Sequence, residues 1–389
     1  MELRPTFTQT EAGLLPADWA LRPLSLLADK IMVGIASAAT HAYRAKGIPL
    51  FRNQNIKAGH LDDSDLLFVS PEYEVAFKNK RLRGGDLLTA RTGYPGTTCV
   101  VPLKYEAAQS FTTLITRPRP ETIDSTYLCH YINSEQGQKF FEQSQIGGAQ
   151  KNVNAGALRK MPVPTPSLPE QRAISTALTD MDALLAGLDR LTTKKRDLKQ
   201  AAMQQLLTGQ TRLPGFQGQW EVKRLGDILT ICHGRNQREV EDADGSYPIL
   251  ATGGQIGTAS RALYDKPSVL IGRKGTINQP RYMDTPFWTV DTLFYSAMKA
   301  DHNAKFLYYR FCLIDWMQYN EASGVPSLNS RTIENVEVSV PAPAEQSAIA
   351  AVISDMDAEL AALDTRRDKT RALKQGMMKE LLTGRTRLV

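Results

Sequence analysis

The stretch EQRAISTALTDMDALLAGLDR at residues 170–190, completed by LLTGQTRL at 206–213, occurs twice in the chain. Its second copy is EQSAIAAVISDMDAELAALDT at 345–365, completed by LLTGRTRL at 381–388. At a constant offset of 175, 25 of the 44 aligned residues are identical, and no gap is needed. Two unrelated amphipathic helices of similar composition would not keep EQ, DMDA, LKQ and LLTG in register, so the chain contains an internal duplication.

Each copy has the pattern of one long helix with an apolar seam. The apolar side chains recur in alternating steps of four and three residues, which is typical of a coiled coil. The seam then weakens and resumes at Leu198 and Leu373. About 40 helical residues form a rod of roughly 60 Å, whose stripe needs a partner, and we expect the two copies to pair as an antiparallel coiled coil. The predicted interface consists of Ile174, Leu178, Met181, Leu185, Leu188, Ile349, Ile353, Met356, Leu360 and Leu363.

The ends of these helices carry recognisable signals. Ser167 and Glu170 have the spacing of a capping box, with a proline in the first turn. Gly209 and Gly384 follow the last periodic residues, where a left-handed C-cap glycine belongs. Both helices are therefore expected to end shortly before these glycines.

The segments that precede the helices repeat more faintly. Trp19-Ala-Leu-Arg-Pro-Leu resembles Trp220-Glu-Val-Lys-Arg-Leu, and NVNAGALRKMPVPTP (152–166) parallels SLNSRTIENVEVSVP (327–341). The residues between these matches diverge. We therefore predict two diverged globular domains and two long helices, in the order domain 1–168, helix 169–212, domain 213–343 and helix 344–389.

The expected fold class is α+β, with two mixed α/β domains separated by the long helices. The final Thr386-Arg387-Leu388 matches Thr211-Arg212-Leu213, which leads directly into the second domain. The chain could therefore be joined end to end into a nearly seamless ring. This predicts a circular, pseudo-two-fold arrangement in which antiparallel helices hold the domains at opposite ends, facing the same way.

Composition and charge limit the functional classes. Of the 389 residues, 42% are hydrophobic and 23% charged, an ordinary globular balance that excludes wholesale disorder. No signal peptide or membrane span is evident, and the four cysteines form no CxxC pair, which favours a cytoplasmic location with free thiols. The net charge of +6 divides into +4, +2, −1 and +1 over the four predicted segments. This charge permits nucleic acid as a partner but does not demand it.

Known catalytic and metal-binding motifs are missing from the sequence. It contains no GxxxxGK[ST] phosphate loop, no GxGxxG after a strand, no GxSxG elbow and no base-methylation motif. The five histidines form no HExxH or similar ligand pair. We therefore predict no catalytic residue, no metal site and no cofactor bound by this chain itself.

Loops bounded by strand-like runs combine glycine with basic and amide residues. Examples are GGDLLTARTGYPG (84–96), TGGQIG (252–257) and VLIGRKGTINQ (269–279). Arg and Lys can bind guanine O6 and N7 in a major groove, and Asn or Gln can bind adenine N6 and N7. Ordinary β-turns with exposed polar residues remain the alternative, although the paired placement favours DNA contact. The candidate DNA-binding residues are Arg52, Asn53, Gln54, Arg91, Thr92, Tyr94, Asn152, Asn154, Gln255, Arg273, Lys274, Asn278 and Gln279.

Taken together, these motifs resemble the DNA specificity (S) subunits of type I restriction–modification systems. The residues that support the resemblance are the paired Trp-containing entries, GDLLTARTGYPG, YPILATGG, LIGRKGTIN and the helix starts VPTPSLPEQ (163–171) and VPAPAEQ (340–346) with their LLTG ends. The resemblance implies two target recognition domains, each reading half of a bipartite double-stranded DNA sequence. It also implies two methyltransferase (modification) subunits docked on the helices and restriction–translocase subunits joining them. S-adenosylmethionine, ATP and Mg²⁺ would be bound by those partners, and adenine methylation at N6 would be the chemistry.

Three alternatives stay open at the level of sequence. The chain could be a stand-alone methyltransferase or nuclease with an unrecognised site. It could be a coiled-coil scaffold that reads no DNA. It could also be a specificity subunit that serves methylation only, without a cleaving partner.

Overall fold

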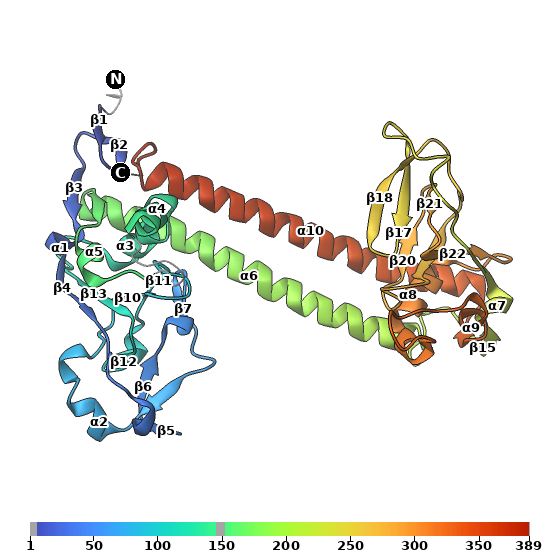
Figure 1. Ribbon diagram of the computed structural model, residues 1–389, viewed down its shortest axis with the longest axis horizontal. Coiled ribbons are helices and arrows are strands. Elements are labelled where there is room, and N and C mark those ends of the chain that lie inside the picture. Colours follow the sequence, from blue (N-terminus) through green and yellow to red (C-terminus); the bar gives the residue numbers. More distant parts are fainter. Residues whose placement is uncertain (1–5, 145–151, 389) are drawn as a thin grey trace. The chain divides into compact units, whose positions relative to one another are not determined.

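The computed structural model describes residues 6–144 and 152–388, and the chain forms two compact units. Unit 1 comprises Met1–Leu188 and Arg366–Val389, and unit 2 comprises Asp189–Thr365. Two 39-residue helices, α6 (Leu168–Leu206) and α10 (Pro343–Leu381), contribute to both units (Figure 1). Each unit therefore combines a globular part with one section of each long helix.

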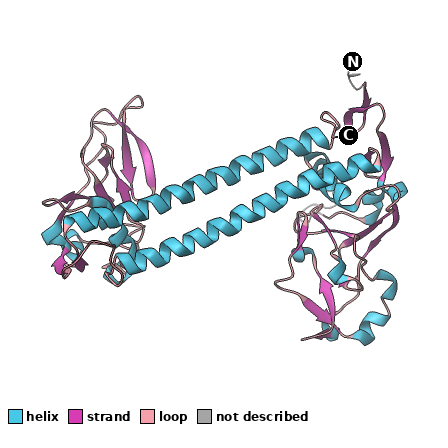
Figure 2. Cartoon of the chain, turned by 180° about the vertical axis from the view of Figure 1, so that it is seen from behind, coloured by secondary structure: helices cyan, strands magenta, loops and turns pink. Residues whose placement is uncertain are grey.

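Unit 1 contains two four-stranded sheets and short helices (Figure 2). The first sheet has the order β11-β10-β13-β4 and is antiparallel throughout, whereas the second, β12-β6-β9-β5, includes the parallel pair β12–β6. Two-stranded pairs β1–β2, β3–β14 and β7–β8 complete the strands. The elements are β1 (Phe7–Thr10), β2 (Gly13–Pro16), β3 (Ala20–Pro23), α1 (Leu24–Leu27), β4 (Ala28–Val33), β5 (Tyr43–Arg44), β6 (Ile48–Phe51), β7 (Ile56–Lys57), β8 (His60–Leu61), β9 (Leu67–Val69), α2 (Pro71–Val75), β10 (Leu87–Thr89), β11 (Thr98–Val100), β12 (Gln109–Ser110), β13 (Leu114–Pro118), α3 (Ser125–Ile132), α4 (Glu135–Ser144), α5 (Ala155–Arg159) and β14 (Pro162–Thr165).

Unit 2 has a smaller set of elements. Its sheets have the orders β16-β22-β19-β20, β18-β17-β21 and β15-β23, and the pair β17–β21 is parallel. The elements are β15 (Glu221–Arg224), α7 (Leu225–Ile228), β16 (Leu229–Cys232), β17 (Tyr247–Ala251), β18 (Gly254–Ala259), β19 (Ser268–Gly272), β20 (Arg281–Met283), β21 (Trp288–Thr289), β22 (Leu293–Met298), α8 (Ala304–Leu313), α9 (Ser330–Glu334) and β23 (Glu337–Val340).

The two globular parts share a core topology, to which unit 1 adds β1, β2, β5, β7 and β8. The sheet order β11-β10-β13-β4 of unit 1 matches β20-β19-β22-β16 of unit 2 when elements are paired in chain order. The parallel pair β12–β6 likewise matches β21–β17. In each unit a two-stranded pair joins the start of the globule to the residues just before a long helix, β3 to β14 and β15 to β23. The duplication seen in the helices therefore extends through the diverged middles.

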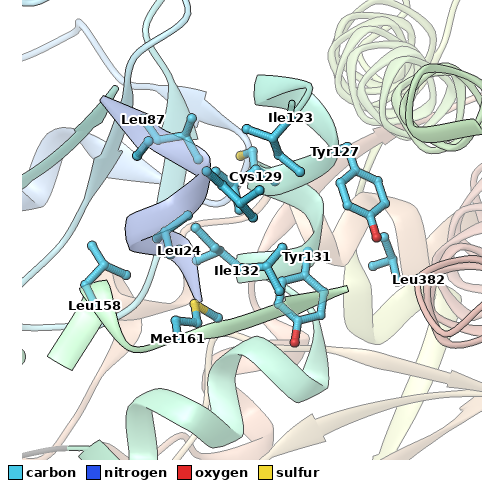
Figure 3. Packing of buried hydrophobic residues seen from close by; sticks show 14 of the residues in the cluster. Leu24, Leu87, Ile123, Tyr127, Cys129, Tyr131, Ile132, Leu158, Met161 and Leu382 are labelled. Atoms are coloured by element: carbon cyan, nitrogen blue, oxygen red, sulfur yellow. The ribbon is translucent and has the colours of Figure 1, made fainter. Parts of the chain in front are cut away.

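Each unit has one main hydrophobic core that contains residues from both long helices. In unit 1, Ile174 and Leu178 of α6 pack in the same cluster as Tyr127 of α3 and Leu382, which follows α10. Figure 3 shows Tyr127 and Leu382 close together in this cluster. In unit 2 the corresponding cluster includes Leu207, which follows α6. The core of unit 1 thus combines the start of α6 with the end of α10, and the core of unit 2 combines the start of α10 with the end of α6.

Charged pairs between the long helices follow the duplication. In unit 1 the Lys374 ammonium pairs with Asp182, and in unit 2 the Lys199 ammonium pairs with Asp357. At the offset of 175, Asp357 is the equivalent of Asp182, and Lys374 is the equivalent of Lys199. The helices are therefore antiparallel within each unit, and the predicted α+β fold with two paired long helices is confirmed.

A buried Glu–Arg pair closes each helix junction. The Arg387 guanidinium pairs with Glu170 in unit 1, and Arg212 pairs with Glu345 in unit 2, with Nη2–Oε2 distances of 2.8 and 2.6 Å. The two glutamates are 1% and 2% exposed. Each arginine also lies over a tryptophan ring, Trp19 at 5.7 Å and Trp220 at 5.8 Å from guanidinium carbon to ring centroid. The repeated TRL and EQ motifs thus meet as charge-assisted pairs.

The predicted C-terminal ends of the helices are confirmed, but the capping box at the start of α6 is half formed, because the Glu170 carboxylate bonds Arg387 and Trp19. The Ser167 hydroxyl accepts a hydrogen bond from the Glu170 backbone N–H at 3.4 Å. Gly209 and Gly384 have φ values of +74° and +67°, which is the left-handed conformation of a C-cap glycine.

The prediction that the apolar seam resumes in the second half of each long helix was wrong. Leu198 and Leu373, where the seam was expected to resume, are 47% and 58% exposed. A straight helix has 3.6 residues per turn, so the stripe drifts away from a strict seven-residue repeat. Thr192 is buried, and Lys195 and Lys199 reach across to carboxylates of α10. Polar side chains therefore line this part of the helix pair.

The ten residues predicted for the coiled-coil interface differ in how deeply they are buried. Those nearest the globular cores, together with one residue farther along α6, are fully buried, and the others are half-buried. The buried ones are Ile174, Leu178, Leu188, Ile349 and Ile353, and the half-buried ones are Met181, Leu185, Met356, Leu360 and Leu363.

Across the described residues 6–144 and 152–388, none of the helices combines the length and apolar character that spanning a membrane requires.

Candidate nucleic-acid interface

Two loops of unit 1 form one groove of about 550 Å³. One loop joins β6 to β7 and the other joins β10 to β11, so both leave strands that the sheets hold in place. Phe111 and Thr112, which lie between β12 and β13, complete the lining. Among the predicted DNA-binding residues, the groove brings together Arg52, Asn53, Gln54, Thr92 and Tyr94.

Some of these side chains connect the loops to one another. The side-chain Oδ1 of Asn53 accepts a hydrogen bond from the Arg91 backbone N–H at 2.8 Å, and Asn53 Nδ2 donates to the Thr112 hydroxyl at 3.2 Å. Arg91 Nε in turn donates to the Val153 carbonyl at 3.3 Å. The polar groups of Asn53 and Arg91 therefore fix the loops, which leaves the surface of the groove to their neighbours.

Other side chains face solvent at the rim of the groove. The Tyr94 side chain is 84% exposed. Within residues 6–144 and 152–388, neither the Tyr94 nor the Thr92 hydroxyl has a hydrogen-bond partner. An exposed aromatic ring beside free hydroxyls can pack on bases or sugars and can donate to or accept from base edges.

Asp65 is part of this site, although it was not among the predicted residues. Its Oδ2 accepts from Arg52 Nη2 and from Gln54 Nε2, each at 2.8 Å. The Asp65 side chain is 69% exposed. In the sequence its only signal is the acidic run Asp62-Asp63-Ser64-Asp65, which gives no indication of a link to residues 52–54.

The predicted asparagines near residue 153 have a different environment. The Asn154 side chain accepts from the Ala157 backbone N–H at 2.8 Å and so caps α5. Asn152 is half-buried, and no hydrogen bond to its Oδ1 is formed within the described part of the chain. Asn329 caps α9 of unit 2 in the way that Asn154 caps α5, which indicates a structural role for this position.

In unit 2 the predicted residues lie on a strand and on a neighbouring loop. Gln255 lies on β18, just after its turn from β17, and the loop after β19 carries the others. The loops are linked because Arg281 Nη2 donates to the Thr252 carbonyl at 2.9 Å. Arg273 forms an ion pair with Asp291 at 2.5 Å, so its charge is partly satisfied within the unit. The side chains of Gln255, Lys274, Asn278 and Gln279 are exposed.

The loop after β10 and the loop after β19 occupy equivalent places. The Val153 N–H donates to the Arg91 carbonyl in unit 1, and the Leu328 N–H donates to the Arg273 carbonyl in unit 2. The residues that follow the arginines differ, Thr92 and Tyr94 in one case and Lys274 and Thr276 in the other. One backbone framework therefore presents two different sets of side chains.

Hydrogen bonds lower the pKa values of two aspartates in the loop that carries Asp65. A hydrogen bond from the Ser64 hydroxyl lowers the pKa of Asp62, and one from the Tyr105 hydroxyl lowers the pKa of Asp63. The described residues hold no group of three His, Cys, Asp or Glu side chains arranged to bind a metal ion. The groove of unit 1 therefore presents hydrogen-bonding side chains that a polar ligand surface can contact.

The family model of the type I restriction modification DNA specificity domain matches the chain at residues 16–196 and 217–370. The chain is 21% identical over 385 residues to the type I restriction enzyme MjaIX specificity subunit of Methanocaldococcus jannaschii, with 86% of each chain covered. It is 23% identical over 257 residues to the EcoKI specificity subunit of Escherichia coli strain K12, covering 61% of this chain and 54% of that protein.

The fold is also similar to a solved structure. The crystal structure of the type I restriction–modification S subunit from M. genitalium superimposes with a TM-score of 0.65 at 16% identity, covering 97% of this chain and 99% of that one. Both sections matched by the family model contain a globular part followed by a large portion of a long helix. The chain therefore belongs to the family of type I restriction–modification DNA specificity (S) subunits.

Proposed function

We propose that this chain reads a bipartite double-stranded DNA sequence, one half with the domain 1–168 and the other with the domain 213–343. The observation that supports this most is the equivalence of the loops after β10 and β19. Since the same framework bears Thr92 and Tyr94 in one domain and Lys274 in the other, each domain can recognise a different half-site. The groove of unit 1 and the exposed amides of unit 2 supply the groups for base contact.

We also propose that the long helices, residues 169–212 and 344–389, dock two methyltransferase subunits. In this proposal the chain has no catalytic activity of its own and acts in the cytoplasm. Methylation, most simply at adenine N6, takes place on the partners, which bind S-adenosylmethionine. Restriction subunits that use ATP and Mg²⁺ join the same complex. The globule of unit 2 is slightly acidic, so partner subunits supply part of the phosphate affinity.

The test is expression of the chain with its methyltransferase subunits in a host that lacks such systems, followed by sequencing of methylated bases. We expect methylation at one motif with two specified halves and an unspecified spacer. The methyltransferase subunits without this chain serve as the control. A scaffold that reads no DNA would leave the methylation pattern unchanged when the chain is omitted. Adding the restriction subunits then shows whether unmethylated motif DNA is cleaved.

Two double variants, one in each domain, test which half of the motif each domain reads. Thr92→Ala combined with Tyr94→Ala should relax one half of the motif, and Asn278→Ala combined with Gln279→Ala should relax the other. Each lost base contact is worth about 1–3 kcal/mol of discrimination. Each variant is the control for the other, because both keep the helices and the opposite domain intact. Relaxation of both halves by either variant would contradict the assignment of one half-site to each domain.

A further inference from the structure

Beside the groove of unit 1 lies an exposed carboxylate, Asp65, that accepts hydrogen bonds from two side chains lining the groove. Asp62 accepts hydrogen bonds from the Ser64 backbone and hydroxyl at 3.1 and 2.6 Å, and Asp63 pairs with Lys104 at 3.0 Å and with Tyr105. Asp65 instead faces Arg52 and Gln54, which line the groove. Of the three aspartates in this loop, Asp65 is therefore the one that is hydrogen-bonded to side chains lining the groove.

The carboxylate of Asp65 holds two candidate base-reading side chains side by side. Both the Arg52 guanidinium and the Gln54 amide donate to the same oxygen, Oδ2. The other oxygen, Oδ1, has no hydrogen-bond partner among the described residues. Gln54 also keeps its carbonyl oxygen and Arg52 keeps Nη1 for outside contacts. The rim therefore presents acceptors beside a donor, which matches the edge of a base pair in the major groove.

A carboxylate at a DNA surface also acts against incorrect sequences. Phosphates repel it, and a base edge that offers an acceptor leaves it unpaired and desolvated, which is costly. An exocyclic amino group, cytosine N4 or adenine N6, instead donates to it. Specificity commonly depends on such a repulsive element as well as on attractive contacts.

We propose that Asp65 is a specificity-determining residue for the half-site read by unit 1, where it orients Arg52 and Gln54 and accepts from an exocyclic amino group of one base. This inference rests on the proposed function, since it assumes that the groove reads DNA.

The position of the loop does not depend on the carboxylate, which makes the substitution informative. The Asn55 side chain, which is buried, donates to the backbone carbonyls of Asp62 and Asp65 at 3.0 and 3.1 Å. Asp65→Asn keeps the size of the side chain and these backbone contacts. A matched control is Asp29→Asn. Asp29 lies on β4, away from the groove, and the substitution removes the same charge from its exposed ion pair with Arg119.

The experiment uses the complex of the chain with its methyltransferase subunits. The motif of the unaltered complex is first obtained from methylated-base sequencing, and binding is then measured on that duplex and on duplexes with one base pair reversed. For Asp65→Asn we expect about tenfold weaker discrimination at a single position of one half-site. We also expect tighter binding to non-cognate DNA at low salt, because a negative charge has been removed. The other half-site should be unaffected.

The outcomes separate the two proposals. If the unaltered complex gives no two-part motif, the proposed function fails. If the motif is present and Asp65→Asn discriminates at every position as well as the unaltered complex does, the role of Asp65 is refuted. A loss of affinity for cognate and non-cognate DNA alike, with a lower melting temperature than Asp29→Asn, would show a structural role and also overturn the proposal.

Discussion

At the scale of single residues, His130 shows how the globule of unit 1 is attached to its long helix. His130 lies on α3, and its Nε2 is 3.5 Å from the hydroxyl of Thr179 on α6. Burial lowers its pKa to about 4, with the nearby Lys374 ammonium acting in the same direction. The imidazole is therefore neutral in the folded protein at neutral pH, although an unfolded chain would protonate it below about pH 6.5.

This pKa predicts a loss of stability in mild acid. Below about pH 6.5 the unfolded state binds a proton that the folded state does not accept until about pH 4, so the free energy of unfolding should fall over this window. The contribution of His130 amounts to at most about 3 kcal/mol. Urea unfolding at pH 7 and pH 5 should show a smaller pH effect in His130→Gln than in the unaltered chain. His60→Gln, at an exposed position, is the control, and equal pH effects in all three proteins would contradict the prediction.

The site could be predicted from sequence only at the level of its loops. Residue type indicated Arg52, Gln54, Thr92 and Tyr94, because glycine-bounded polar loops tend to be exposed. The uses of Asn53 and Asn154 could not be foreseen, since each bonds a backbone group whose position depends on the tertiary fold. Asp65 was missed for the same reason, because β7 and β8 separate it from the residues it contacts.

At the scale of elements, the duplication was sufficient to predict the paired helices and their ends. Identical motifs at one offset predicted the helix starts and the glycine C-caps. Leu198 was misassigned because a heptad pattern assumes supercoiling, whereas here Lys199 crosses to Asp357. The shared sheet order of the two globules was beyond the reach of sequence, since β10, β13 and β19 are buried along their whole length and so give no alternating apolar pattern.

The two C-cap glycines should differ in their tolerance of a side chain. Gly384→Ala places a Cβ against the Pro16 ring and 3.0 Å from Trp19 Cζ2, whereas in Gly209→Ala the nearest atoms are 3.3 Å away on Trp220. Both substitutions strain a residue with positive φ, at about 1–2 kcal/mol. We expect Gly384→Ala to cost roughly 1–3 kcal/mol more because of overpacking. Urea unfolding of the two variants compares them directly, and equal costs would show that the Pro16–Trp19 segment yields freely.

At the scale of the whole molecule, one of the two units is built from segments that are far apart in the sequence. Unit 1 takes its first 188 residues from one end of the chain and residues 366–389 from the other. Unit 2 is one continuous segment, Asp189–Thr365. The sequence match between Thr211-Arg212-Leu213 and Thr386-Arg387-Leu388 anticipated this, because it equated the C-terminal end with the entry to a globule.

A truncation after Thr365 should therefore destabilise the N-terminal globule and spare the segment next to the cut. The deletion removes Leu381 and Leu382, which are buried in the core of unit 1, and Arg387, which pairs with the buried Glu170. Two buried leucines are worth roughly 1.5–3 kcal/mol each, and an unpaired buried carboxylate adds roughly 3–5 kcal/mol.

Hydrogen exchange followed by mass spectrometry tests this in the full-length and truncated chains. Strands β10 and β13 of unit 1 should lose protection after truncation, while β19 and β22 of unit 2 keep theirs, because their core is formed by residues 206–353. An Arg387→Ala variant of the full-length chain should show a weaker version of the same pattern. Loss of protection confined to unit 2, or an equal loss in both units, would mean that the C-terminal end of the chain does not complete the first globule.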